Sequence, residues 1–398
     1  MLFERHHFRF FGNREMTSLY VALALTGFGE GLISLFVPIY FWQLGFPLWR
    51  IIFFYFLISV YFTALTFLFA SFLRRLSDKM MMFLSVPFAI IYFLGLGEIS
   101  TYPVLFFALP AVHALNILLF NVGYHLDFSG SADKDHIGTE VGMRSLVVSL
   151  VTIGAPFIGG VIIVLFGFQY VFLTGSLVLF AAILPLLFFP KRRAAPDIGA
   201  GRVWNFLTAR ALLPFTASGA GYAMASMVGV IVWPLFIFFA LSGIESYGGV
   251  QSAGLLASSL TAFFVGFLSD QGKRRRTLRY SALALSLVWA SRAFIGGALV
   301  VVASHALGQT VDAALSVAWS SQYYKIARSL PDASAFILSR EALYHITRIF
   351  FLPVLMLLAY LLRQNAFFAA SFVLAALSTI LYLYANKMPH TNELNHYA

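Results

Sequence analysis

The chain has 398 residues, of which 60% are hydrophobic, 17% are aromatic and only 11% are charged. A soluble domain cannot bury that much apolar surface, so the composition excludes an ordinary globular protein and predicts a membrane protein. The formal net charge of +10 does not indicate nucleic acid, because the cations cluster at the ends of apolar segments, where anionic lipid and topology explain them. The chain has no cysteine, which excludes disulfides and thiolate metal sites.

The sequence begins with a basic and aromatic stretch, MLFERHHFRFFGNRE. It lacks a small-residue cleavage site before the first apolar segment, so residues 1–16 are expected to remain as a cytoplasmic tail on the membrane surface. Twelve apolar segments follow, and each can cross a bilayer as a helix, for which roughly 20 residues suffice. None has the alternating pattern of a barrel strand, so the predicted fold class is an all-α polytopic membrane protein.

The predicted spans fall into two sets of six. The first set lies near 17–42, 48–73, 79–98, 101–124, 140–166 and 168–189, and the second near 210–242, 247–269, 277–296, 299–325, 338–362 and 365–386. Between the sets, KRRAAPDIGAGR combines charge, proline and glycine, which predicts a cytoplasmic linker over 190–209. The expected domains are therefore six-helix bundles over 17–189 and 210–386, with a cytoplasmic C-terminal tail over 387–398.

The charges also predict an orientation. An even number of spans places both termini on one side of the membrane. If that side is the cytoplasm, the positive-inside rule holds with three exceptions, Arg50, Arg292 and Arg363. We therefore expect an integral protein of the cell membrane, inner or plasma, with both termini in the cytoplasm.

An internal repeat relates the two sets of spans. Pro38 in LFVPIYF corresponds to Pro234 in IVWPLFI, and Glu140 before MRSLVVSL corresponds to Glu341 before ALYHITRI. The repeat predicts two similar six-helix halves, related by an axis along the membrane normal.

One loop, GFLSDQGKRRR at 266–276, resembles the signature of the major facilitator superfamily, Gly-x-x-x-Asp-x-Gly-Arg/Lys-Arg-Arg. Its defining positions are occupied by Gly266, Asp270, Gly272, Lys273 and Arg274. The equivalent loop of the first half, SFLRRLSDKM, departs from the signature, with Ser71 and Ser77 in place of the glycines and Arg75 in place of the acid. The resemblance implies two pseudo-symmetric bundles that enclose one central site, and a cytoplasmic gate at this loop.

Glu30 is the most informative single residue. It lies near the centre of the first span between Gly29 and Gly31, with Gly27 one turn away. An ionised acid at that depth is costly unless it is paired, hydrated or protonated, and the glycines would let a substrate or another backbone approach. We expect Glu30 to bind a proton or a cationic substrate group. The alternative is a structural acid held by hydrogen bonds between helices.

Other polar residues lie at a similar depth. His113 and Asn116 are in the fourth span and Asp312 is in the tenth. The resemblance implies that spans one, four, seven and ten line a central cavity, where these groups would meet Glu30 as substrate- or proton-binding residues; a packed, hydrogen-bonded His113 is the alternative. Arg292, in the ninth span, is expected either to bind an anionic substrate group or to pair with Asp312. We favour the ion pair, because span nine is peripheral in this architecture.

A set of charges is expected at the cytoplasmic ends of spans four, five, ten and eleven. Its members are Asp127, Glu140, Arg144, Lys325, Arg340, Glu341, His345 and Arg348. Ion pairs across the two halves would break as the halves move apart. For most of these residues we favour a solvated network of small energetic weight.

The sequence contains no phosphate loop, nucleophile elbow, ion filter or metal-ligand spacing, so neither an enzyme nor a nucleotide-driven pump is expected, and no cofactor. We expect a monomeric secondary active transporter that moves a small organic solute or amphiphile by alternating access, coupled to protons. The aromatic content favours a drug or metabolite exporter in contact with membrane lipids. A lipid or glycolipid flippase on the same scaffold and a non-transporting membrane scaffold or receptor are the alternatives.

Overall fold

The computed structural model describes residues 14–73, 75–131, 137–187, 199–330 and 332–387. Most of both predicted tails, and residues 190–198 of the predicted linker, lie outside these ranges. Within them the chain is helical and has no strand, which confirms the predicted fold class. Eleven stretches are long and apolar enough to cross a membrane, and one of them, Ile244–Arg292, contains two helices joined at a kink, so the described chain makes twelve crossings.

The first half contains six crossings. They are formed by α2 (Arg14–Ile33) continued through η1 (Ser34–Phe36) into α3 (Val37–Gln43), α4 (Leu48–Leu73), α5 (Asp78–Gly97), α6 (Leu105–Ser131), α7 (Ile137–Thr152) with α8 (Ala155–Phe166), and α9 (Phe168–Ala181) with α10 (Ile183–Leu187). These bounds agree with the six predicted spans to within a few residues at most ends.

The second half begins with a short helix that does not cross. This is α11 (Ala200–Thr208). The first crossing of this half is formed by η2 (Arg210–Leu212), α12 (Leu213–Met227), η3 (Val228–Val232) and α13 (Trp233–Leu241). The others are α14 (Ile244–Leu268), which η4 (Ser269–Lys273) joins to α15 (Arg274–Arg292), then α16 (Ala298–Ser329), α17 (Ala333–Leu361), and α18 (Gln364–Ile380) with η5 (Leu381–Lys387). The predicted linker thus contains a helix.

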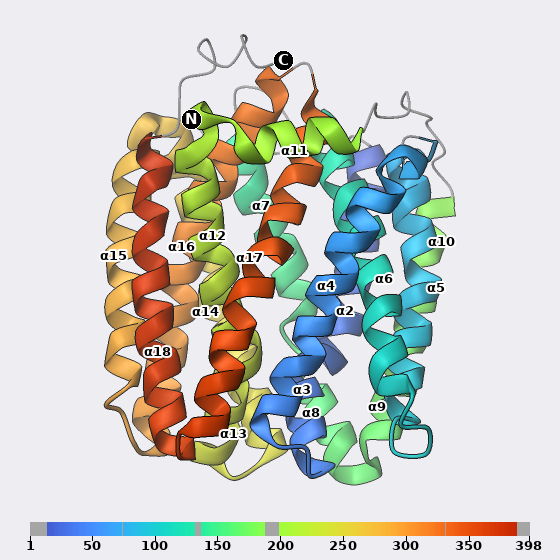
Figure 1. The fold of residues 1–398 in the computed structure, drawn as a ribbon, viewed down its shortest axis with the longest axis vertical. Helices are drawn as coiled ribbons and strands as arrows, with labels where there is room; N and C mark the ends of the chain where they lie inside the picture. Colours follow the sequence, from blue (N-terminus) through green and yellow to red (C-terminus); the bar gives the residue numbers. More distant parts are fainter. Residues whose placement is uncertain (1–13, 74, 132–136, 188–198, 331, 388–398) are drawn as a thin grey trace.

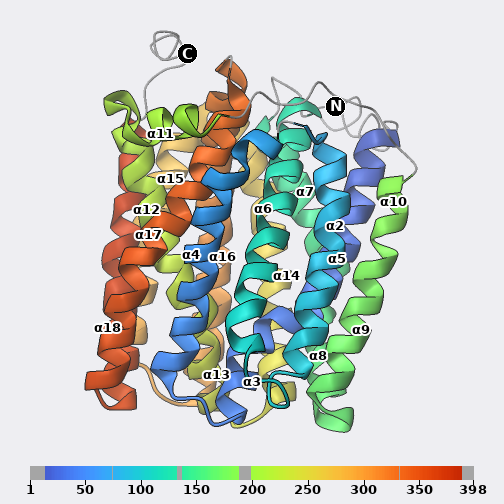
Figure 2. The same cartoon turned by 45° about the vertical axis from the view of Figure 1, so that its right-hand side comes forward.

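The crossing helices run roughly side by side, and α11 lies across one end of them (Figure 1). We call that end the α11 side, and the opposite end, where α3, α8 and α13 lie, the far side. Turning the molecule separates α5, α9 and α10 of the first half from α12, α15 and α18 of the second (Figure 2). The halves meet where α14 packs along α7 and α8, and where α17 packs along α4.

Both prolines of the predicted repeat follow a distorted turn. Pro38 comes after the 3₁₀ turn Ser34–Phe36, and Pro234 comes after the π-turn Val228–Val232. Proline has no N–H to donate to the preceding turn and crowds the carbonyl group there, so the helix is irregular just before it. The first helix of each half is therefore distorted at the same place in the repeat.

Glycines allow α14 to lie against α7 and α8. A Cβ on Gly266 would lie 2.5 Å from the carbonyl oxygen of Gly138, and one on Gly142 would lie 2.6 Å from the carbonyl oxygen of Ala262. On the far side, a Cβ on Gly248 would overlap the carbonyl oxygen of Pro156. Small residues let two helix backbones approach closely, so this glycine seam sets the distance between the halves.

Replacing Gly248 by alanine tests this packing. The added methyl group meets backbone, which cannot rotate away, so we expect Gly248→Ala to cost about 1–3 kcal/mol and to lower the unfolding temperature by several degrees. Gly249→Ala is the matched control, because its nearest neighbour is the Phe157 ring at 3.8 Å, an ordinary contact. The measurement is thermal unfolding of the purified protein, and equal unfolding temperatures for the two variants would contradict the account.

Candidate functional site

A cavity of about 280 Å³ lies where the two halves meet. We call it the inter-bundle cavity. Side chains from α6 and α7 of the first half and from α12, α16, α17 and η5 of the second half line it. Its ionisable residues are Arg144, Arg340, Glu341, Arg348, His125 and His345.

Glu341 is bound by side chains of both halves. It is only 3% exposed, and its Oε1 accepts hydrogen bonds from Nε of Arg340, at 3.1 Å, and from Nη2 of the same guanidinium. Its Oε2 accepts a hydrogen bond of 3.0 Å from Nδ2 of Asn121 on α6. His125, one turn further along α6, places Nε2 3.8 Å from Oε1. A buried carboxylate therefore links α17 to α6.

The other two arginines of this cavity have neutral partners. Arg144 donates from Nη1 to the hydroxyl of Tyr124, and its guanidinium lies 5.1 Å from the centre of that ring. Arg348 donates from Nη2 to Oγ of Ser226 over 3.2 Å, and its Nη1 lies 3.4 Å from Nε2 of His345. Within the described part of the chain, neither guanidinium forms an ion pair with a carboxylate.

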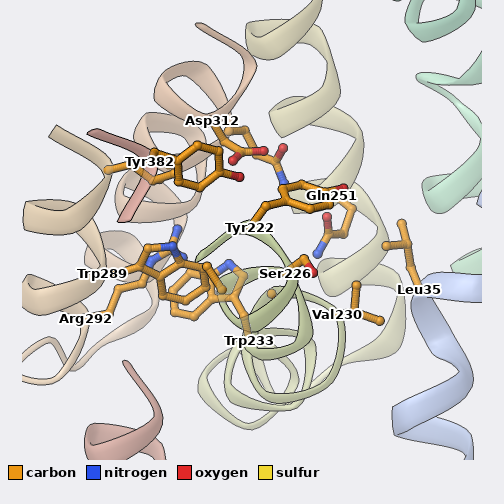
Figure 3. A pocket seen from close by; sticks show the side chains of 15 residues that line it. Leu35, Tyr222, Ser226, Val230, Trp233, Gln251, Trp289, Arg292, Asp312 and Tyr382 are labelled. Atoms are coloured by element: carbon orange, nitrogen blue, oxygen red, sulfur yellow. The ribbon is translucent and has the colours of Figure 1, made fainter. Parts of the chain in front are cut away.

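A second cavity, of about 270 Å³, adjoins the first and is lined by the second half together with Leu35 of the first half. Tyr222 and Tyr382 line both cavities. In Figure 3 these tyrosines lie near Asp312, while Arg292 lies beside Trp289 and Trp233 at the other end of the group. The Arg292 guanidinium is 3.7 Å from the ring centre of Trp233 and 4.2 Å from that of Trp289, so it is held between two aromatic faces.

The prediction that Arg292 forms an ion pair with Asp312 was wrong. Arg292 instead donates from Nε to Oγ of Ser304 over 3.2 Å and from Nη2 to the carbonyl oxygen of Ser304 over 3.1 Å. Gly308 lies directly beneath the guanidinium, where any Cβ would overlap Nη2. Because Ser304 and Asp312 are each one turn from Gly308, on opposite sides, Arg292 reaches the serine and leaves the carboxylate facing the cavity.

The other predicted site residues lie elsewhere. The His113 ring stacks on Tyr92 of α5, with ring centres 4.0 Å apart, and Nδ2 of Asn116 donates 3.0 Å to the carbonyl oxygen of Ser85 on α5. Glu30 is half-buried on α2 and forms no hydrogen bond or ion pair with a described residue. Neither Glu30 nor His113 nor Asn116 lines the two cavities, whereas Asp312 and Arg292 line the second.

The glycines around Glu30 serve helix packing. Cβ atoms on Gly27 and Gly31 would contact Thr152 of α7 and Ala155 of α8. A Cβ on Gly29 would lie 3.1 Å from the carbonyl oxygen of Gly175 on α9. Of the two roles that the sequence allowed for these glycines, the approach of other helices is the one observed.

The loop after α14 contacts the first half. Asp270 accepts a hydrogen bond of 2.9 Å from the backbone N–H of Gly138 and one of 2.6 Å from that of Thr139. N–H groups at the start of a helix have no acceptor within that helix, so Asp270 supplies the acceptor for these two N–H groups of α7. The helix dipole also favours a negative charge there. Gly272 has φ +80°, the left-handed conformation that turns the chain into α15, and the exposed Lys273 and half-buried Arg274 follow it.

Several solved structures share this architecture. The Escherichia coli fucose:proton symporter is 12% identical, with a TM-score of 0.68 over 94% of this chain and 98% of that one. The human organic anion transporter MFSD10 is 13% identical, with a TM-score of 0.67 over 93% and 99%. A bacterial homologue of the iron transporter ferroportin, solved in an outward-facing state, is 14% identical, with a TM-score of 0.68 over 93% and 98%.

The chain has the major facilitator fold. No model of a protein family matches the sequence, and no curated protein matches it. At this level of identity the similarity extends to the fold alone, so the function of the site must be argued from its own residues. Among the described residues, no group of three or more His, Asp or Glu side chains is placed to hold a metal ion.

The major facilitator fold buries the charges that were expected to be solvated. Asp127, Glu140 and Glu341 are each less than one-tenth exposed, and so is Arg340. The prediction that these charges form a solvated network was therefore wrong for these four residues. The reason is that the halves meet on the α11 side, so the ends of α6, α7 and α17 face one another there.

Sequence reasoning missed Asn121, His125, Tyr222 and Ser226. A periodic signal was present, because Asn121 and His125 are four residues apart on α6 and Glu341 and His345 are four residues apart on α17. Polar residues spaced by four in an otherwise apolar helix lie on one face. That pattern marks the inter-bundle face more directly than depth in the membrane does.

Replacing Asp270 by asparagine tests its contact with α7. The amide would lack the charge and one of the two acceptors, so we expect Asp270→Asn to separate α7 from α14 on the α11 side in a larger fraction of molecules. Because the chain has no cysteine, two introduced cysteines can carry spin labels for distance measurements. The control is Asp332→Asn, which removes an ion pair with the half-exposed Arg202. Unchanged distance distributions for Asp270→Asn would show that Asp270 does not hold α14 to α7.

Proposed function

We propose that the chain is a secondary active transporter that moves a small organic solute across a membrane by alternating access. The observation that carries the proposal is the inter-bundle cavity, because its charged lining comes from both halves, with Arg144 on α7 and Arg340, Glu341 and Arg348 on α17. A solute bound at such a seam becomes accessible to one side or the other when the halves rock.

Contacts between the halves on both sides of the cavity support this mechanism. On the far side, the Tyr247 hydroxyl donates 3.0 Å to the carbonyl oxygen of Leu35, and the rings of Trp42 and Phe239 lie 5.1 Å apart. On the α11 side, Asp270 and Glu341 bind the first half. To open toward one side, the protein must break the contacts between the halves on that side while the contacts on the other side remain.

The cavity favours a polar solute over the hydrophobic compounds suggested by the aromatic content. Many aromatic side chains, such as Phe264, Phe294 and Phe350, are exposed on the outside of the molecule, where lipid would cover them. The inter-bundle cavity instead contains three guanidinium groups and a carboxylate. Transport of an uncharged amphiphile would leave these groups without a role.

The remaining expectations fit this proposal. Lys273 and Arg274 follow α14, which supports the positive-inside expectation that this side of the membrane, with the linker 190–209, is cytoplasmic. The transporter works as a monomer in a cell membrane, with the solute, protons and lipids as its partners. Its domains are the bundles 17–189 and 210–386.

A reversible crosslink tests alternating access. A Cβ on Gly160 would lie 3.2 Å from the Cα of Glu245 on the far side, which is within reach of a disulfide. We expect the double variant Gly160→Cys, Glu245→Cys to lose transport when oxidised and to regain it on reduction. The assay is uptake by proteoliposomes of a defined mixture of small organic acids, amines, sugars and amino acids, measured by mass spectrometry.

The two single cysteine variants are the controls, because they cannot form the bond and should transport equally with and without oxidant. Solutes that enter at the full rate when the crosslink is complete do not use an alternating pathway. Such a result would overturn the proposal.

Glu30 is the proposed proton carrier of this transporter. It is a carboxyl group inside a span, without a described partner, on the helix that packs against α7, α8 and α9. A gradient of one pH unit can drive about tenfold accumulation through one-to-one coupling. We expect Glu30→Gln, which cannot exchange a proton, to abolish this gradient-driven accumulation while exchange of solute continues.

Glu98→Gln is the matched control, because Glu98 is an exposed acid just after α5 on the far side. Uptake is measured in proteoliposomes with and without an imposed pH gradient. If the Glu30→Gln variant accumulates solute with an unchanged pH dependence, Glu30 is not the proton carrier.

A further inference from the structure

The inter-bundle cavity has more cationic than anionic groups. Its three guanidinium groups belong to Arg144, Arg340 and Arg348, and its one carboxylate belongs to Glu341. Glu341 is occupied by Arg340, with two hydrogen bonds, and by Asn121. Its charge is therefore balanced by Arg340, and the charges of Arg144 and Arg348 remain.

Within the described part of the chain, no carboxylate forms an ion pair with either of these two arginines. Glu140 is one turn before Arg144 on α7, but no ion pair joins the two side chains. Asp312 lines the second cavity, beyond Tyr222 and Tyr382. The other ionisable groups at this cavity, His125 and His345, add no negative charge. Both guanidinium groups are half-buried and lack a paired carboxylate, so an anion that enters the cavity gains favourable interactions there.

Both arginines also have unused donors. Nε of Arg144 and Nε of Arg348 are buried and have no hydrogen-bond partner. Each guanidinium has five N–H donors in a planar fork. Tyr124 uses one nitrogen of Arg144, whereas Ser226 and His345 contact Nη2 and Nη1 of Arg348 and leave its Nε without a partner. A carboxylate can accept two parallel hydrogen bonds from such a fork. The unpartnered nitrogens are the second, independent indication of an anionic ligand.

We propose that the solute of this site is a small organic acid, bound as its anion between Arg144 of the first half and Arg348 of the second. This inference rests on the proposed function and names the substrate class of the same cavity. The volume of about 280 Å³ is at the lower end for ligand cavities, which selects a small acid. Trp319 and Tyr344 line the same cavity and can contact an apolar body attached to the carboxylate.

The two arginines also explain how binding would favour closure. Arg144 is on α7 of the first half and Arg348 is on α17 of the second, so an anion bound by both would add attraction between the halves. Substrate would thus stabilise the closed arrangement more than the open one, which is the condition for a ligand to shift a conformational equilibrium.

The first test compares acids with their amides. Glutarate is compared with glutaramide, and benzoate with benzamide; each amide has nearly the same size as its acid and no charge. Inorganic phosphate is a further probe. Binding to the purified full-length protein is measured by thermal stabilisation, and uptake is measured in proteoliposomes. We expect at least one carboxylate to bind about tenfold or more tightly than its amide, a factor that one charge-assisted hydrogen bond can supply.

The second test uses variants of the two arginines. Arg348→Gln and Arg144→Gln should each weaken carboxylate binding about tenfold or more, while Arg348→Lys, which keeps the charge but not the fork, should weaken it less. Arg363→Gln is the control, because Arg363 is exposed before α18 and should leave binding unchanged. The comparison of acids with amides uses the unaltered chain, so it stays decisive if a variant fails to fold.

The outcomes separate this inference from the proposed function. Amides that bind and enter as well as acids, or amines and sugars that enter while acids do not, overturn the anion inference and leave transport intact. Binding of phosphate without any carboxylate identifies an inorganic anion and also overturns it. If no probe binds and no solute of the mixture enters in a crosslink-sensitive way, the transport proposal itself fails.

Discussion

The arrangement of the two halves depends on how charge is buried between them. Glu341 sits in an apolar bundle, where an unpaired carboxylate would be prohibitively costly, and its partners come from α17 itself and from α6. His125 extends the link, because its Nδ1 lies 2.6 Å from the Tyr324 hydroxyl on α16. Separating the halves on the α11 side would break these contacts together, so the closed state is held by polar groups that the open state must hydrate.

The loop that carries the signature contacts the other half, whereas the equivalent loop of the first half makes a contact within its own helix. Asp270 finds two N–H groups at the start of α7, and Gly138 there leaves room for the carboxylate. In the equivalent loop, Ser77 instead caps its own helix by accepting a hydrogen bond of 3.2 Å from the N–H of Met80. An arginine at position 75 has no lone pair to offer a helix N-terminus. The two halves therefore share the helix architecture but not this contact of the loop.

The fold could be predicted from the sequence because its determinants are local. Apolar length defines each span, and Pro38 and Pro234 mark the distorted turns. The site could not, because depth in the membrane does not specify the direction of a side chain around its helix. His113 lies near the expected depth but stacks on Tyr92 of α5, and Arg292 was unpredictable without knowing that Gly308 would lie beneath it. Side-chain direction depends on helix packing, which a single sequence does not contain.

The π-turn of the seventh crossing connects the two cavities. Ser226, which binds Arg348, lies just before Val228–Val232, and Trp233, which covers Arg292, lies just after it. A π-turn inserts an extra residue, and such turns are frequent at functional sites. Bending there would move the serine of one cavity relative to the tryptophan of the other. The two cavities are therefore lined by neighbouring segments of one helix, and Leu35 of the first half also lines the second cavity.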